Sequence, residues 1–206
     1  DGFHWNRENK KPFLPVSEDF HAWNAGNVQS TAGSPLIVGD SLYFYVSGRY
    51  NSKPKHDSNF ATGLAMLRRD GFVSMRAGRK EGYIEIKTQI PANGNYLFVN
   101  ADVKGTLAVE VLDDNGQPME GFTKKDCISM KKSDKTKQMI SWEKHPGVTS
   151  LVGKTVRLKF YLNQADIYAF WISAWQTGES GGYTGGGGPG LSDEGIDTPM
   201  DKLKNN

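Results

Sequence analysis

The sequence has little of three things that would define its class: cysteine, net charge and long apolar runs. Its 206 residues include one cysteine, Cys127, which excludes an internal disulfide framework and a zinc site built from cysteines. The 25 basic and 23 acidic residues nearly balance, which gives no electrostatic footprint for nucleic acid or an anionic membrane. No run approaches the roughly eighteen apolar residues of a membrane span. We therefore expect no nucleic-acid partner and no membrane span.

Glycine, by contrast, is abundant, with 24 of the 206 residues. This share exceeds the roughly 7% of an average protein and indicates many tight turns or a low-complexity segment. The length allows one large domain or two small ones, with enough buried surface for a core that needs no disulfides.

Residues 1–80 show short strand-like runs between turn residues, with no helical period sustained over three turns. Asp70-Gly71 between two of these runs is typical of a tight hairpin, because its backbone tolerates positive φ. Four consecutive antiparallel strands of this size match one blade of a β-propeller. One blade cannot bury both of its faces, so we expect residues 1–80 to be a terminal blade whose partner blades precede Asp1. The four runs are Ser34–Val38, Ser41–Ser47, Thr62–Arg68 and Phe72–Ala77.

Residues 81–176 have the pattern of an antiparallel, jelly-roll-like β-sandwich. Asn93-Gly94 and Asn115-Gly116 mark tight turns, and Val156–Leu162 alternates apolar with polar residues as a half-buried strand does. Seven strand candidates with regular turns favour a sandwich. They are Gly82–Ile90, Tyr96–Val103, Leu107–Leu112, Phe122–Ile128, Lys137–Trp142, Val156–Asn163 and Ile167–Ser173. The remaining residues, 177–206, form a Gly-rich and polar C-terminal tail with little to bury. The predicted fold class is therefore all-β.

Two glycine-rich matches to catalytic motifs lack the structural context that such motifs need. Gly178–Gly182 fits the nucleophile elbow G-x-S-x-G, but glycines rather than a helix follow Ser180. Gly185–Gly190 fits the dinucleotide fingerprint, but it neither follows a βαβ strand nor opens a helix. We reject both and predict no cofactor.

A metal site is not indicated either. Asp113–Gly116 could be read as a calcium loop, but its spacing breaks the EF-hand pattern and Asn-Gly favours a hairpin turn. The histidines are scattered without the spacing of a metal site. They are His4, His21, His56 and His145.

The large aromatic residues have two interpretations. Trp and Tyr can stack on sugar rings, which combine an apolar face with polar edges. Ordinary packing of a β core is the alternative, and we assign most of them to it. The residues are Trp5, Trp23, Tyr43, Tyr45, Tyr50, Trp142, Tyr168, Trp171 and Trp175.

Blade topology predicts one candidate binding site. The first two strands of a blade run antiparallel, so the start of the first strand and the end of the second reach the same rim of the channel. Amide, hydroxyl and guanidinium groups would gather there beside a tyrosine, which suits hydroxyl-rich or anionic ligands. The alternative is that they cap strand ends and fix the loop 48–61. The candidate substrate-binding residues are Asn27, Gln29, Ser30, Arg49 and Tyr50.

Five sequence motifs and a glycine-rich ending carry a resemblance to a known family. They are Asn27–Ser30 (NVQS), Leu36–Arg49 (LIVGDSLYFYVSGR), Thr62–Met75 (TGLAMLRRDGFVSM), Leu97–Asp102 (LFVNAD), Val156–Trp171 (VRLKFYLNQADIYAFW) and Glu179–Gly190 (ESGGYTGGGGPG). Together they resemble bacterial, planctomycete-type proteins described as glycosyl hydrolase family 32-like. The resemblance implies a five-bladed β-propeller followed by a β-sandwich, with this chain as the last blade plus the sandwich. It also implies an extracellular or periplasmic location.

The resemblance implies a carbohydrate-active protein but assigns no catalytic residue to this chain. Glycosidases of this type place their catalytic carboxylates on earlier blades, and the corresponding N-terminal motifs are absent here. One hypothesis is a glycoside hydrolase-like enzyme with its catalytic residues upstream and the sandwich as a packing or accessory carbohydrate-binding module. The alternative is a non-catalytic carbohydrate-binding or structural protein of an extracellular assembly. In both, the expected partners are carbohydrate and the N-terminal blades of the same protein.

Overall fold

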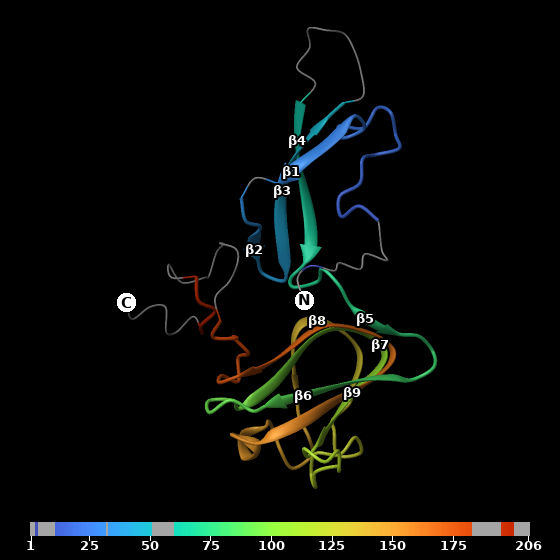
Figure 1. Cartoon of the computed structure of the whole chain (residues 1–206). Coiled ribbons are helices and arrows are strands. Elements are labelled where there is room, and N and C mark those ends of the chain that lie inside the picture. Colours follow the sequence, from blue (N-terminus) through green and yellow to red (C-terminus); the bar gives the residue numbers. More distant parts are fainter. Residues whose placement is uncertain (1–2, 4–10, 32, 51–59, 183–194, 200–206) are drawn as a thin grey trace. The chain divides into compact units, whose positions relative to one another are not determined.

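The protein is all-β, with two antiparallel sheets, and the described residues hold no α-helix (Figure 1). The chain folds into two compact units, each with its own set of spatial contacts. The first comprises 1–36 and 43–66, and the second comprises 37–42 and 67–206. The computed structural model describes residues 3, 11–31, 33–50, 60–182 and 195–199.

The first sheet has four strands, and its central strand is β3. Antiparallel pairing places Asn27 of β1 opposite Arg49 of β3. β3 also pairs with β2 and β4, so each strand of this sheet contacts β3. The strands are β1 (Asn27–Thr31), β2 (Leu36–Val38), β3 (Ser41–Arg49) and β4 (Phe60–Arg68).

One face of this sheet is covered by the segment that precedes it. The indole of Trp23 lies against Gly48 of β3 and Gly63 of β4, and a Cβ added at Gly63 would come within 2.3 Å of the ring. Phe13 packs edge-on against Phe44 with ring centroids 5.6 Å apart. The two glycines therefore make the space in which the indole lies flat across two strands.

The second sheet has five strands and curls into a half-barrel. Its middle strands, β7 and β9, pair along most of their length, while β8 flanks β7 and both β5 and β6 flank β9. A single 3₁₀ turn, Thr149–Leu151, precedes β9. The strands are β5 (Met75–Ala77), β6 (Gly82–Gln89), β7 (Tyr96–Leu112), β8 (Met130–Ile140) and β9 (Thr155–Ser173).

The curl has a local cause, because three neighbouring strands are irregular at the same level. The register of β7 with both neighbours shifts between Val103 and Thr106. Opposite this shift, Lys132 of β8 and Gln164 of β9 have positive φ, 47° and 44°. Extra residues of this kind bend a strand and increase its twist. Gly105 lies at the bend, where an added Cβ would come within 2.4 Å of the Asn163 carbonyl oxygen.

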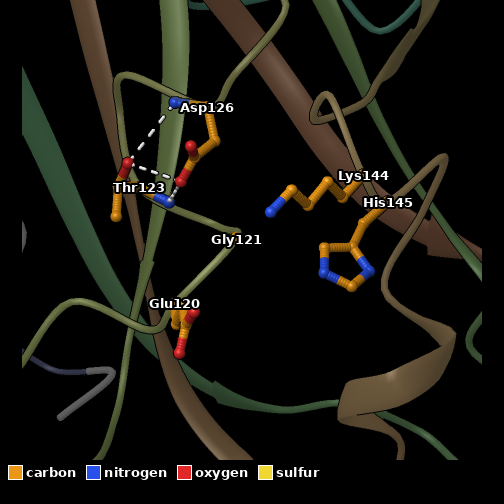
Figure 2. Close-up of a pocket in the computed structure, with 6 residues that line it drawn as sticks. All are labelled: Glu120, Gly121, Thr123, Asp126, Lys144 and His145. Atoms are coloured by element: carbon orange, nitrogen blue, oxygen red, sulfur yellow. Dashed lines mark hydrogen bonds between the residues drawn. The ribbon is translucent and has the colours of Figure 1, made fainter.

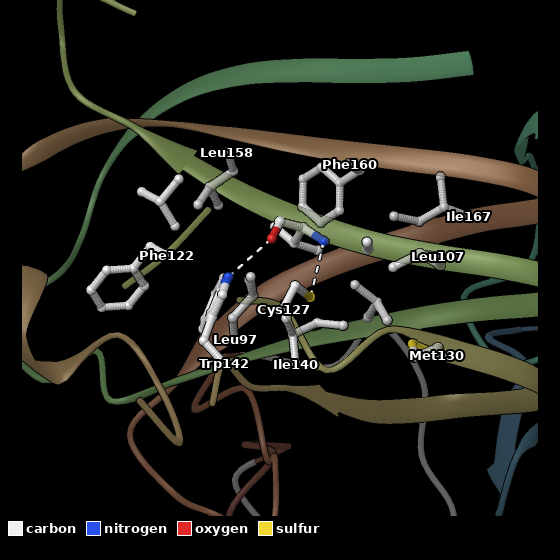
Figure 3. Close-up of a cluster of buried hydrophobic side chains, with 14 of the residues drawn as sticks. Leu97, Leu107, Phe122, Cys127, Met130, Ile140, Trp142, Leu158, Phe160 and Ile167 are labelled. Atoms are coloured by element: carbon white, nitrogen blue, oxygen red, sulfur yellow. Dashed lines mark hydrogen bonds between the residues drawn. The ribbon is translucent and has the colours of Figure 1, made fainter. Parts of the chain in front are cut away.

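The core of the second unit fills the inside of the half-barrel (Figure 3). Trp142 is buried and donates its indole N–H to the Val109 carbonyl at 3.0 Å. Phe122 packs edge-on against it at 5.1 Å. Cys127 is also buried and accepts a hydrogen bond from the Val109 amide at 3.2 Å, and burial raises the pKa of its thiol. The one cysteine therefore belongs to the core.

Several predicted strands have the right position in the sequence but the wrong length. Tyr96–Val103 and Leu107–Leu112 form one continuous strand, as do Val156–Asn163 and Ile167–Ser173, because the residues between them form bends within strands rather than turns. Phe122–Ile128 is not a strand, and it packs as a loop over the core.

The fourth strand predicted for the first group has a different partner from the one expected. Its structured part, β5, pairs with β9 of the second sheet instead of with β4. Beside this backbone pairing, Arg76 of β5 donates to the carboxylate of its register partner on β9, Asp166, at 2.8 Å.

Candidate functional site

An open pocket of about 460 Å³ lies among the loops of the second unit (Figure 2). One wall is the loop that follows β7, which folds back so that the Val111 amide donates to the Phe122 carbonyl and the Met119 amide to the Val111 carbonyl. The other wall is the turn at Trp142–His145, closed by backbone hydrogen bonds in both directions. The lining residues are Glu120, Gly121, Thr123, Asp126, Lys144 and His145.

The imidazole of His145 is held flat within this pocket. Its ring stacks on Phe122 with centroids 4.2 Å apart and planes 10° apart. A Cβ added at Gly121 would come within 2.8 Å of the His145 Nε2 atom, so glycine permits the backbone to approach the ring. The ring is therefore fixed by packing, with a polar nitrogen beside the pocket.

Thr123 and Asp126 hold each other on the opposite side (Figure 2). The Thr123 hydroxyl and amide donate to Asp126 Oδ2 at 2.7 and 3.1 Å. The pKa of Asp126 is lowered by the hydrogen bond from the Thr123 hydroxyl, by the hydrogen bond from the Thr123 amide and by the charges of Lys144 and Lys125. Desolvation acts in the opposite direction and does not outweigh their combined effect. Asp126 is therefore an ionised acceptor at neutral pH rather than a proton donor.

The pocket combines carboxylate acceptors, an ammonium donor, a hydroxyl and an imidazole within one concavity. Its volume lies within the range of small-molecule sites, about 300–1,000 Å³. Such a set can hydrogen-bond the hydroxyl groups of a polar ligand in several directions. A glycosidase needs a carboxylic acid with a raised pKa, and the lowered pKa of Asp126 does not suit that role.

A row of three aspartates crosses the half-barrel on adjacent strands. Asp102 of β7 is the register partner of both Asp134 of β8 and Asp166 of β9. Like charges opposite each other are unfavourable, but Arg68 pairs with Asp134 and Arg76 with Asp166. Burial alone would raise the pKa of Asp166, yet hydrogen bonds from Arg76 and Ser74 outweigh it and lower the pKa. The row therefore fastens the segment 68–76 to the sheet.

The predicted binding residues lie at one end of the first sheet. Asn27 and Arg49 are register partners, and the Gly26 amide donates to the Arg49 carbonyl at 2.8 Å. The Arg49 guanidinium lies over the Phe60 ring at 4.4 Å, and its Nε is buried without a hydrogen-bond partner. Gln29 and Tyr50 are exposed, whereas the Ser30 side chain lies outside the described part. Their role in ligand binding stays a prediction.

The motifs set aside on sequence grounds have structural roles where they are described. Asp113 accepts hydrogen bonds from the Asn115 and Gln117 amides, which closes a turn in which Gly116 has a φ of 83°. The Ser180 amide donates to the Asp197 carboxylate at 2.8 Å, and the two described residues that follow it, Gly181 and Gly182, are not helical. The Gly185–Gly190 match lies outside the described residues.

Most large aromatics in the described segments pack within the protein, as the core interpretation predicts. Trp142 is buried, Trp23 lies on two glycines, and Trp171 stacks on Phe98 at 5.6 Å. Tyr45 and Tyr50 are exposed, and Trp5 lies outside the described part.

Metal clusters and membrane-spanning helices are both absent from the described segments. These segments contain no group of three or more His, Cys, Asp or Glu that could hold a metal ion. They also contain no helix with the length and hydrophobicity that a bilayer crossing requires. His4 and His56 lie outside these segments.

Sequence patterns did not predict the loop pocket. Glu120, Asp126 and His145 come from two loops that are separated along the chain, and no fixed spacing links them. The one usable signal was Thr123-x-x-Asp126, a pattern in which a hydroxyl and a carboxylate bond each other's backbone.

Comparison with known proteins assigns no family. The chain matches no family profile, and neither the curated proteins nor the solved structures include a significant match.

Proposed function

We propose that the second unit is a carbohydrate-binding module and that the loop pocket is its sugar site. The observation that carries this proposal is the pocket itself, in which an ionised Asp126 and a flat, fixed His145 face one concavity with Glu120 and Lys144. Sugars are bound by such convergent donors and acceptors. The resemblance described above supports the same ligand class.

We further propose the architecture that the resemblance implies. In it, the first sheet is the terminal blade of a β-propeller, the second unit is a jelly-roll-like sandwich, and the N-terminal blades of the same protein are partners. The protein would be extracellular or periplasmic. Any glycoside hydrolase activity would depend on carboxylates upstream of this chain, and its own part would be binding.

A glycan array followed by calorimetric titration of the best glycan tests the sugar site. Lys144→Ala removes the ammonium that lies beside Asp126, and we expect at least a tenfold loss of affinity with little change in melting temperature. Lys154→Ala is the matched control, because Lys154 is exposed and lies outside the pocket. Absence of glycan binding, or equal affinity of the two variants, would contradict the proposal.

A structural role in an extracellular assembly is the second candidate. The observation that favours it is an uncovered apolar face on the first sheet, where Phe60 and Met66 are more than half exposed. A protein that only binds sugar has no need of such a face.

A further inference from the structure

The bend of the half-barrel gathers basic side chains in a row across the sheet. Lys131 of β8 is opposite Thr106 of β7, which is in turn opposite Asn163 of β9. The Asn163 side-chain amide donates to the Arg79 carbonyl at 2.7 Å, so Arg79 lies at the end of the row. Neighbouring strands are about 4.8 Å apart, which makes the row about 14 Å long. We call the exposed cations on and beside this row the basic band, and they are Arg79, Lys80, Lys104, Lys131, Lys132 and Lys135.

The basic band has an excess of positive charge. Within the described part of the chain, none of its six side chains forms an ion pair. The nearest carboxylates are those of the aspartate row, where Arg68 pairs with Asp134. Arg76 pairs with Asp166 in the same row. The formal net charge of only +2 for the whole chain therefore conceals a local excess in the second unit.

Two residues at the bend have a backbone conformation that does not suit their side chains. Lys132 and Gln164 have positive φ, 47° and 44°, and both are exposed. Glycine, asparagine and aspartate adopt this conformation at lower cost than other residues. The bend requires the backbone conformation but not a long polar side chain at either position. Strain that the fold does not require is typical of positions where the side chain itself has a role.

The kind of cation and its surroundings identify the ligand. Five of the six cations are lysines, which are flexible point charges without the fixed fork of arginine. They suit charges that repeat along a chain better than one small anion held in a fixed orientation. The residues between them are Thr106, Asn163 and Gln164. These can hydrogen-bond hydroxyl groups, and they offer no aromatic ring on which a nucleobase could stack.

We propose that the basic band binds an acidic polysaccharide. Its carboxylate or sulfate groups lie against the lysines, and its hydroxyl groups lie against the polar residues between them. The choice of a glycan rests on the sugar-binding function proposed above, whereas the negative charge of the ligand follows from the band itself. Salt should weaken this binding, because the contacts are exposed charges that counterions screen.

Calorimetric titration of the full chain with polygalacturonate tests the proposal, and fully methyl-esterified polygalacturonate is the neutral match with the same backbone. We expect binding of the acidic form only. Lys131→Gln combined with Lys132→Asn should weaken it about tenfold or more, since each cation at an anionic surface contributes about 1 kcal/mol. Asparagine accepts positive φ, so the melting temperature should not fall. Dextran sulfate and dextran form a second matched pair, which reports sulfate in place of carboxylate.

Lys87→Gln combined with Lys154→Gln is the control. It removes the same charge from two exposed lysines near the other end of β6, and we expect less than about a twofold loss. Equal losses in the two double variants would overturn the proposal, because net charge alone would then explain the binding. Binding of neither acidic polymer, binding of duplex DNA as tight as that of polygalacturonate, or binding only of phosphatidylserine vesicles would also overturn it.

The basic band and the loop pocket can fail separately. The pocket is tested with the best glycan of the array and Lys144→Ala, whereas the band is tested with polygalacturonate and the Lys131/Lys132 double variant. Loss of polygalacturonate binding in the double variant but not in Lys144→Ala would support the band even if the pocket bound no sugar. A neutral glycan bound at the pocket, with no binding of either acidic polymer, would overturn the band and leave the pocket in place.

Discussion

Tyr161 is a tyrosine whose surroundings hold it in the neutral form. Burial, the hydrogen bond that it donates to Glu110 at 2.7 Å and the charges of Glu110, Glu81 and Glu85 raise its pKa to about 12. An unfolded tyrosine titrates near 10. The contribution of Tyr161 to the free energy of unfolding is therefore fully present below pH 10 and is lost as the pH rises towards 12. Difference titration at 295 nm between wild type and Tyr161→Phe should show this late deprotonation.

Glu110→Gln provides the control for Tyr161. It removes the acceptor charge but keeps an oxygen in place, so the pKa of Tyr161 should fall towards 10. A Tyr161 phenol that deprotonates near pH 10 in the folded wild type would contradict this account of its surroundings.

At the scale of residues, the sequence predicted neighbours only where strand pairing fixed them. Asn27 and Arg49 were placed together from strand order alone, and the register confirms that they are opposite each other. His145 and Asp126 could not be placed together, because two irregular loops bring them to one pocket and loop backbones follow no period.

Among the elements, the packing of β3 and β4 depends on the contact that Gly48 and Gly63 make with Trp23. Gly63→Ala would place a methyl group within 2.3 Å of the indole, so the ring or the strands must move. We expect a loss of about 1–3 kcal/mol in the free energy of unfolding, as for other overpacked sites. Urea denaturation followed by tryptophan fluorescence measures this loss.

The matched control for this packing is Gly78→Ala. No atom lies within 4 Å of a Cβ at Gly78, so its substitution should change stability by less than about 0.5 kcal/mol. Equal urea midpoints for the two variants would show that Trp23 does not lie against Gly63.

Strand positions were predictable because alternation and turn residues mark them, whereas strand continuity was not. The prediction ended one strand before Lys104-Gly105-Thr106 and another before Gln164-Ala165-Asp166, yet each triplet lies within a continuous strand at the bend of the half-barrel. Glycine and positive-φ residues serve turns and bulges alike. Pairing with strands that are distant along the chain decides whether a turn or a bulge forms. The local sequence does not contain that information.

For the whole molecule, the sequence predicted an all-β protein, and the structure shows two sheets that differ in how their faces are buried. The half-barrel encloses its own core and carries the loop pocket. The four-stranded sheet buries one face with its own chain and leaves the other uncovered. The loop pocket, which the sequence did not predict, has groups suited to a small polar ligand, whereas the predicted binding residues lie on the other unit, at one end of the four-stranded sheet.

The most direct test of the sugar-binding proposal is an NMR titration of the ¹⁵N-labelled chain with the best glycan from the array. The proposal predicts that amide shifts concentrate at Gly121, Thr123, Asp126 and His145, which line or border the pocket. Shifts concentrated instead at Asn27, Arg49 and Tyr50, or no shifts in either region, would contradict it.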